Sequence, residues 1–407
     1  MNKDIILELI DKKINHLSYI EEKIKDFNNI DEKISEYLKE LVFSKNYLKD
    51  VCNELNNNII PNDFYSKIHT SVEMINTKEL FTALNMPHFQ INTDSLKSYC
   101  QNYPLNSFSS FVTYKFYKDL GFLTDNIVVV GANGSGKSTL ADNLKTIIDG
   151  KYGVVIPAQK LLIIPTFENI PNYNSSSREY DEYQKNYTDG KTTYNASQTN
   201  DIPYTDTQKY GSEYKYVLKT LMAERSHIRN IFCTNYSNDV NVNKTDLHSK
   251  LDTAIEIWNS LIEHRVMYIN ESNELNIKDP SKQEEYPAYR MSDGEKNILY
   301  LIGRVLLAKE DSVIIIDEPE MYLHKSIVNK LWDKLELLRQ DCIFIYLTHD
   351  LDFASSRKAN KYWIRDFKYP MIWDINAIPE NEIPENLLMK LLESRKKYCS
   401  VRVKITA

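Results

Sequence analysis

Glycine and cysteine are both scarce in this sequence, and each shortage excludes a class of structure. Only 10 of the 407 residues are glycine, which excludes long glycine-rich linkers. The cysteines are odd in number, scattered, and form no Cys-x-x-Cys pair, so neither a disulfide framework nor a zinc site is expected. They are Cys52, Cys100, Cys233, Cys342 and Cys399. Reduced thiols are the expected state.

The sequence also lacks an excess of basic over acidic residues, and it lacks long apolar runs. The formal net charge is -7, which argues against a generally basic nucleic-acid coat and leaves room only for a local basic face. No apolar run approaches a membrane span, and the amino terminus has no signal-peptide core. No heptad run is long enough for an extended coiled-coil arm. We therefore expect a soluble cytoplasmic protein with no membrane partner.

Three of the few glycines fall in one nine-residue stretch, Gly131–Thr139, after the apolar run 127–130 and before a helix-patterned segment. The pattern Gly-x4-Gly-Lys-Ser is typical of a phosphate-binding loop, in which backbone amides surround phosphate oxygens and the lysine reaches the β and γ phosphates. The alternative is a simple glycine turn between a strand and a helix. The predicted nucleotide-binding residues here are Gly131, Asn133, Gly134, Ser135, Gly136, Lys137, Ser138 and Thr139, with Ser138 also a Mg²⁺ ligand.

Polar side chains follow three further predicted strands. Asp317 and Glu318 end the apolar run 313–316, and His349 ends the run 342–347. We predict that Asp317 binds Mg²⁺, that Glu318 is the general base for the attacking water, and that His349 contacts the γ-phosphate. A helix start is the alternative for Asp317 and Glu318. Gln159, which follows the predicted strand 154–158, is a second candidate Mg²⁺ ligand, with an ordinary surface glutamine as the alternative.

A tight polar turn, 291–296, precedes a predicted helix at 297–307. The Ser292 hydroxyl and the Gly294 amide at the start of a helix can form an anion site. This turn lies too far along the chain to be a second loop around the same phosphate.

The remaining segments predict the domain organisation. Apolar residues at three- and four-residue steps through 10–55, broken at 27–31, predict an antiparallel helical hairpin. Aromatic and β-branched residues in 107–130 predict strands around a turn at Gly121, and Phe116 or Tyr117 could stack on adenine or serve the sheet core. A tyrosine-rich segment, 171–216, predicts a surface insertion. Helices are expected at 213–232 and 247–264, with a hairpin at 266–277. The predicted parts are 1–105 (helical region), 106–170 (first half of the core), 171–287 (insertion), 288–372 (second half) and 373–407 (C-terminal tail).

The order of phosphate loop, glutamine, Ser-x-Gly-Glu turn, Asp-Glu strand and His strand resembles the ATP-binding-cassette ATPases. The resemblance covers about 107–170 and 288–365. It implies an α/β fold, a P-loop ATPase head with an N-terminal helical hairpin and a helical insertion, with ATP and Mg²⁺ as cofactors. It also implies a head-to-tail dimer, in which Ser292, Gly294 and Glu295 of one protomer close on the γ-phosphate held by the other. Catalytic roles would fall to Glu318, His349 and Lys137. Asp293 stands where transporters usually have glycine, and the usual Ser-Ala-Leu-Asp does not follow Glu318, so a transport motor is disfavoured.

The forms Ser-Asp-Gly-Glu-Lys, Asp-Glu-Pro-Glu-x-x-Leu-His and Leu-Thr-His-Asp look like prokaryotic ATPases allied to OLD-family and Rad50-like proteins, many of them antiphage. Segments at 373–374, 383–385 and 392–396 resemble the junction at which some of these proteins continue into a TOPRIM-like nuclease, or, in PARIS-type defence, act with a separate nuclease. The nuclease acids are absent here. The resemblance therefore implies an ATP-hydrolysing sensor or switch that dimerises on ATP and controls a nuclease-like effector partner, with DNA or a phage protein as a possible trigger. The alternative is a DNA-repair or recombination ATPase of the Rad50/RecF-like class.

Overall fold

The structure is a computed structural model that describes residues 2–27, 31–85, 92–123, 125–147, 153–158, 172–185, 206–238, 243–282, 284–368 and 372–378. The chain divides into two compact units. The first is Met1–Thr124 with Tyr369–Ile372, and the second is Asp125–Lys368 with Trp373–Ala407. None of the helices within these described ranges is long and apolar enough to cross a membrane.

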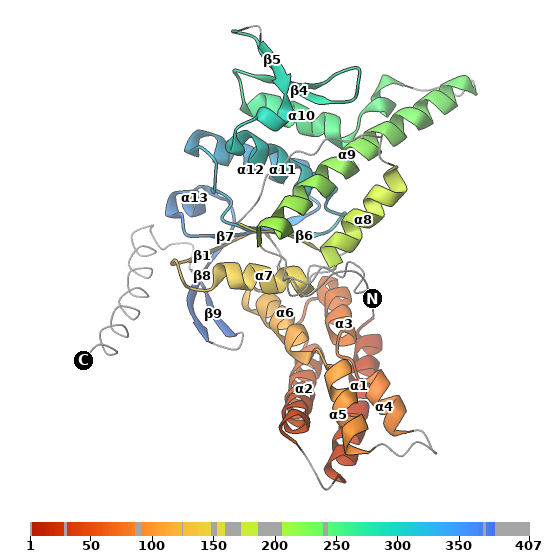
Figure 1. The fold of residues 1–407 in the computed structure, drawn as a ribbon. Helices are drawn as coiled ribbons and strands as arrows, with labels where there is room; N and C mark the ends of the chain where they lie inside the picture. The colour runs from red at the N-terminus through yellow and green to blue at the C-terminus, as the bar shows by residue number, and fades with distance from the viewer. Residues whose placement is uncertain are drawn as a thin grey trace. The chain divides into compact units, whose positions relative to one another are not determined.

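The first unit is built from helices (Figure 1). They are α1 (Lys3–Lys25), α2 (Glu32–Asn56), η1 (Asn62–Phe64), α3 (Tyr65–Glu73), α4 (Lys78–Leu84), α5 (Thr93–Asn102) and α6 (Ser107–Asp119). The predicted hairpin is confirmed, because α1 and α2 are separate helices packed on each other, with the break where the sequence placed it. Asp31 caps α2 by accepting a hydrogen bond from the Ile34 amide at 2.9 Å. Five apolar side chains of α1 are fully buried, namely Ile6, Ile10, Leu17, Ile20 and Ile24.

The prediction of strands at 107–117 is wrong, because these residues form α6. Their apolar side chains recur at three- and four-residue steps, so one helical face can bury them, and this burial outweighs the strand preference of aromatic residues. Phe116 and Tyr117 are 2% and 5% exposed, and the Tyr117 ring lies 5.0 Å from the Phe64 ring. They belong to the core of the helical unit, so the prediction that either stacks on adenine is also wrong. Since α6 packs on α2 and α3, this unit extends past the predicted boundary at residue 105.

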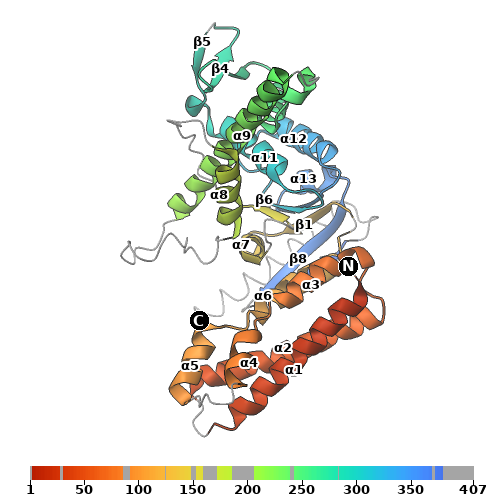
Figure 2. The same cartoon turned by 90° about the vertical axis from the view of Figure 1, so that its right-hand side faces the viewer.

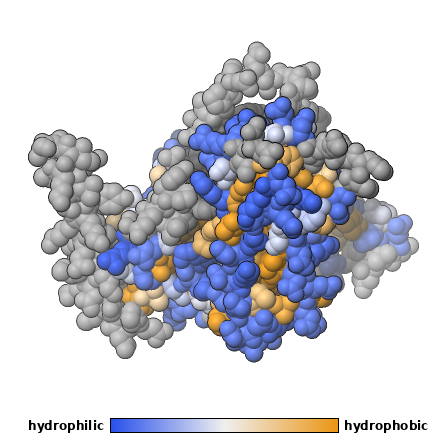
Figure 3. Space-filling model, turned by 90° about the horizontal axis from the view of Figure 1, so that it is seen from below, coloured by the Kyte–Doolittle hydropathy of each residue, from blue (hydrophilic) through white to orange (hydrophobic). Residues whose placement is uncertain are grey.

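Charged and polar side chains occupy the outward faces of these amphipathic helices. The face drawn in Figure 3 is mainly hydrophilic, with smaller hydrophobic patches between the polar side chains. Among the described residues of the first unit, the large exposed apolar side chains are separated along the chain, namely Ile5, Val42, Ile59 and Tyr103. Scattered exposure of this kind is normal for a protein surface.

The second unit is organised around a six-stranded sheet of order β2-β6-β7-β1-β8-β9. Its strands are β1 (Ile127–Gly131), β2 (Gly153–Ile156), β6 (Val313–Asp317), β7 (Ile343–Thr348), β8 (Asn360–Lys368) and β9 (Ile372–Ala377). The pairs β2·β6, β6·β7, β7·β1 and β1·β8 are all parallel. β1, β2 and β6 are buried along their whole length, as expected for parallel strands covered on both faces. The predicted α/β fold class is confirmed.

Helices cover both faces of this sheet. The described helices of the second unit are α7 (Lys137–Ile147), α8 (Tyr173–Lys185), α9 (Asp206–Ser237), α10 (Lys250–Leu261), α11 (Asp293–Leu307), α12 (Lys325–Leu338) and α13 (Leu351–Ser356), with η2 (Lys244–Leu247) and η3 (Ala288–Arg290). Figures 1 and 2 show α11, α12 and α13 together on one side of the sheet and α7 on the other. The two helices expected in the insertion are confirmed as α9 and α10.

A second, antiparallel sheet contains β3 (Val266–Ile269), β4 (Leu275–Asp279) and β5 (Glu284–Pro287). It confirms the predicted hairpin, with Ile269 opposite Leu275, and adds a third strand. The tyrosine-rich segment is only partly a surface feature, since Tyr180 on α8 and Tyr214 on α9 are 5% and 0% exposed. Both rings lie in the hydrophobic core of the second unit, and residues 186–205 lie outside the described part of the chain.

Candidate functional site

The glycine loop between β1 and α7 has the backbone shape that its sequence predicts. Gly134 and Gly136 have φ angles of +87° and +85°, a region that favours glycine. Gly131 is required for a different reason, because a Cβ there would lie 2.5 Å from the Ser135 hydroxyl. Asn133, Ser138 and Thr139 are exposed along the loop and Ser135 is buried. The loop is therefore a concave backbone turn opening at a helix N-terminus, which suits an anion.

Lys137 is held inside this loop. Its ammonium donates hydrogen bonds to the carbonyl oxygens of Gly131 at 2.8 Å and Ala132 at 3.2 Å, and the residue is 5% exposed. Burial lowers the pKa of Lys137, while three carboxylates facing it, those of Asp317, Glu318 and Glu320, oppose that shift. The structure therefore brings the phosphate-loop lysine near Asp317 at the end of β6 and near Glu318 and Glu320, which follow it.

Asp317 and Glu318 occupy the carboxyl end of β6, but their backbones differ. Asp317 completes the strand opposite Leu347 of β7 and is 1% exposed. Glu318 has a φ angle of +51°, and its amide donates to the Leu347 carbonyl at 2.8 Å. A left-handed glutamate is strained and persists only where its surroundings fix it. The turn directs the two consecutive carboxylates differently, which fits a buried metal ligand beside a more accessible base.

His349 follows β7 and faces two glutamates. Its Nδ1 atom lies 3.4 Å from Glu318 Oε1 and 3.6 Å from Glu320 Oε1. Glu320 also accepts a hydrogen bond from the Thr348 hydroxyl at 2.6 Å. Burial raises the pKa of Glu320, and the Thr348 hydrogen bond partly offsets this. Sequence reasoning assigned no role to Glu320 or Thr348, although Glu320 stands in the Asp-Glu-Pro-Glu segment that carried the resemblance.

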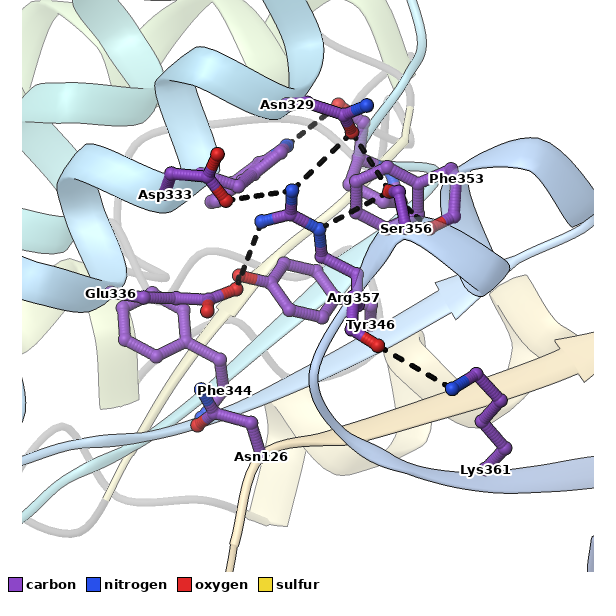
Figure 4. A network of polar contacts seen from close by, with 12 residues as sticks. Asn126, Asn329, Asp333, Glu336, Phe344, Tyr346, Phe353, Ser356, Arg357 and Lys361 are labelled. Atoms are coloured by element: carbon purple, nitrogen blue, oxygen red, sulfur yellow. Dashed lines mark hydrogen bonds and ion pairs between the residues drawn. The ribbon is translucent and has the colours of Figure 1, made fainter. Parts of the chain in front are cut away.

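Arg357 ties the helix after His349 to the helix after Glu318 (Figure 4). Its guanidinium lies 2.8 Å from Asp333 and 3.4 Å from Glu336, and it donates to Asn329 at 3.4 Å. These three partners share one face of α12, whereas Arg357 directly follows α13. Arg357 is 4% exposed, so this contact anchors α13 to α12 below the surface.

The Ser292 turn forms a capping box at the start of α11. The Ser292 amide and hydroxyl each donate to Glu295 Oε2 at 2.8 Å, and Glu295 Oε1 pairs with Arg265 at 2.6 Å. A Cβ on Gly294 would lie 3.0 Å from the Tyr322 carbonyl, so the turn packs on the segment that follows Glu318. Both carboxylate oxygens of Glu295 are engaged within the chain, and its contact with a nucleotide stays a prediction.

Gln159, the second predicted Mg²⁺ ligand, lies outside the described residues, as do the tail segments at 383–385 and 392–396. Trp373 of β9 does reach the site, because its Nε1 donates to the Gly136 carbonyl at 3.1 Å. Sequence reasoning placed Trp373 only in a domain junction, and no local motif signals its contact with a loop 237 residues away.

The fold and this site define a mixed α/β domain with a parallel sheet and a phosphate-loop motif between β1 and α7. Residues 220–355 match a family described as "AAA domain, putative AbiEii toxin, Type IV TA system". The matched range includes Ser292, Asp317, Glu318 and His349 and begins after the phosphate loop. No curated protein matches the sequence.

Several solved structures are similar to the chain. The Smc head domain with an extended coiled coil, bound to the C-terminal domain of ScpA from Pyrococcus furiosus, is 15% identical with a TM-score of 0.27. That match covers 47% of this chain and 46% of that one, so this chain spans less than half of it. An Smc head bound to the C-winged helix domain of ScpA is 13% identical, covering 63% and 91%, with a TM-score of 0.35. An inward-facing putative metal-chelate type ABC transporter is 15% identical, covering 65% and 77%, with a TM-score of 0.27.

Proposed function

We propose that this protein binds ATP with Mg²⁺ at the phosphate loop and hydrolyses it. The observation that carries the proposal is the meeting of Lys137, Asp317, Glu318 and His349 at the carboxyl edge of one parallel sheet. In open α/β sheets this edge is where ligands bind. The residues fit the cofactor, since the loop has the glycine-dependent cradle for phosphates and a buried lysine at its centre.

Each residue has a defined part in the reaction. Lys137 exchanges its loop carbonyl partners for β- and γ-phosphate oxygens, and Ser138 and Asp317 are the residues that would hold the magnesium. The metal, when bound, neutralises charge that develops on the phosphates. Glu318 takes the proton of the attacking water as the water oxygen bonds to the γ-phosphorus and the bond to the β-phosphate oxygen breaks. His349, oriented through Nδ1 by the two glutamates, presents Nε2 to the γ-phosphate.

The finer proposal is that hydrolysis serves a switch. ATP draws two copies into a head-to-tail dimer, in which Ser292, Gly294 and Glu295 of one copy close on the nucleotide of the other. The dimer controls a nuclease-like effector in prokaryotic antiviral defence, with DNA or a phage protein as trigger. The resemblance to OLD-type and PARIS-type ATPases supports this role, and so does the toxin–antitoxin wording of the family matched by residues 220–355.

Steady-state phosphate release with and without Mg²⁺ tests the site. Lys137→Ala should lower turnover by about a hundredfold or more, because the phosphates lose their only loop lysine. Lys330→Ala, an exposed lysine of α12, is the matched control and should behave as the native protein. Native-level turnover by Lys137→Ala would exclude this site. Stimulation of the native protein by double-stranded DNA would instead favour the alternative Rad50/RecF-like role.

A further inference from the structure

Three charged side chains are buried together away from the nucleotide site. Glu213 of α9 accepts a hydrogen bond from the Lys145 ammonium at 3.0 Å through Oε2, and its Oε1 lies 3.0 Å from the Arg304 guanidinium. The side chains of Lys145, Glu213 and Arg304 are 2%, 2% and 0% exposed. Burial opposes ionisation of Glu213, but Lys145 and Arg304 outweigh it and hold its pKa below the usual range.

The cluster of Lys145, Glu213 and Arg304 lies at the β2 edge of the six-stranded sheet. Arg304 also donates to the Val155 carbonyl at 3.0 Å, on the edge strand β2, and to the Tyr180 hydroxyl at 2.7 Å. Next to it, Gly303 lets α11 approach α9 closely, since a Cβ there would lie 2.7 Å from Val217 Cγ1. Figures 1 and 2 show α7 and α11 on opposite sides of the sheet. One carboxylate therefore joins helices on opposite sides.

The helices α7 and α11 each begin at or directly after a residue that is predicted to contact the nucleotide. Lys145 lies about two turns beyond Lys137 on α7, and Arg304 about three turns beyond Ser292 on α11. Separating either cation from Glu213 would break a contact between opposite charges that are both buried, which is costly. When α7 shifts, moving α11 with it therefore costs less free energy than breaking the contacts of Lys145 and Arg304 with Glu213.

We propose that Glu213 is a positioning residue that couples nucleotide binding at the phosphate loop to the placement of the Ser292 turn. The inference rests on the proposed ATPase function and adds to it a route between the two halves of the composite site. Stability alone gives little reason for such a cluster, since replacing buried ion pairs with apolar residues of similar volume is often neutral or stabilising.

Because buried ion pairs can often be replaced by apolar residues without loss of stability, a variant without the three charges can test the coupling role. The triple variant Lys145→Met, Glu213→Leu, Arg304→Met removes all three charges, and urea unfolding shows whether stability is retained. ATP affinity should stay within about threefold of native, while kcat falls by about tenfold or more. Hydrogen exchange should show native amides 293–297 protected by Mg-ATP, and the triple variant unprotected. The matched control is Glu179→Gln, which removes a contact of α9 to α8, Lys219–Glu179 at 2.6 Å, without touching α7 or α11.

The outcomes separate the two proposals. A stable triple variant with native kcat and native protection would show that the cluster only stabilises, and would overturn the role of Glu213. If the triple variant does not fold, Glu213→Asp gives the answer, because its shorter carboxylate keeps the charge but cannot span both cations. It should lose turnover at unchanged ATP affinity, and native turnover would overturn the inference. Failure of the native protein itself to bind ATP would contradict the proposed function instead.

Discussion

Glu318 is the residue whose backbone departs most informatively from regular structure. A backbone conformation with a φ of +51° costs free energy, on the order of 1–3 kcal/mol. The hydrogen bond to Leu347 and the packing of the turn must offset this cost. The turn aims its carboxylate at His349 while Asp317 stays in the strand. The strained geometry thus separates the carboxylate of the proposed base, Glu318, from that of the proposed metal ligand, Asp317.

Glu318→Gln should bind ATP as tightly as the native protein and hydrolyse it about a hundred to ten thousand times more slowly, because the proton acceptor is lost while Asp317 remains. Single-turnover hydrolysis and light scattering with ATP measure both effects. ATP should accumulate in a dimer. Loss of ATP binding in this variant would show that Glu318 is needed for the structure of the turn.

Glu320 leads to a prediction about pH. Its pKa is raised, mainly by burial, so the folded state binds its proton more tightly than the unfolded state does. The charges that face it are His349, Lys137 and Asp350. The native protein therefore loses stability from this residue as pH rises through the folded pKa. Glu320→Gln keeps an acceptor for Thr348 without the charge, so it should be more stable than native at about pH 8, and the gain should shrink toward about pH 5.

Urea unfolding of both proteins across that pH range measures the difference. A variant less stable than native at high pH would show that the ionised carboxylate is stabilised by His349 and Lys137 more than it is penalised by burial. Turnover at the same pH values reports separately on how Glu320 orients His349.

At the scale of elements, the placement of His349 depends on how α13 is fixed. This helix is only six residues long, too short to be stable alone. Asp350 caps it by accepting from the amides of Asp352 at 2.8 Å and Phe353 at 3.1 Å, and Arg357 anchors its other end to α12. His349 is therefore held by its strand on one side and by an anchored helix on the other.

Arg357→Met should destabilise the protein by about 2 kcal/mol, since hydrogen bonds to charged groups are lost, and should lower kcat more than ATP affinity. Lys325→Met is the matched control, because Lys325 and Asp352 also join α12 to α13, at 3.0 Å, with side chains 80% and 83% exposed. An exposed pair of this kind contributes little. Equal loss of kcat in both variants would contradict a specific role for the Arg357 anchor.

At the scale of the whole molecule, the proposed dimer requires the Ser292 turn to meet the phosphate loop of a second copy. If it closes on a second copy, Ser292→Arg should bind ATP nearly as native does but fail to hydrolyse it or to associate. Mixing it with Lys137→Ala should restore partial turnover, because one of the two composite sites in a mixed dimer carries neither lesion. Light scattering and phosphate release measure this. No restoration, with the same mass with and without ATP, would contradict the dimer and favour a site completed within one chain or by another partner.

The sequence by itself determined the local structures whose signals lie within a few residues. The phosphate loop follows from the three glycines and Lys137, the buried strand β6 from its apolar run, and the helical hairpin from its periodicity and the cap at Asp31. The family-level motifs also predicted that Asp317, Glu318 and His349 belong with this loop. Each of these features depends on the spacing of residues within a short segment and not on how distant segments pack.

Only the tertiary structure decided which elements are neighbours. It placed β7 between β1 and β6, which brings His349 between the loop and Glu318. It turned 107–117 into a helix, because burial on α2 and α3 outweighed the strand preference of the aromatic residues. It also assembled Glu213 with Lys145 and Arg304, and Trp373 with Gly136, from residues far apart in sequence. Such contacts depend on how faces pack and on which buried charges meet, and no local pattern encodes either.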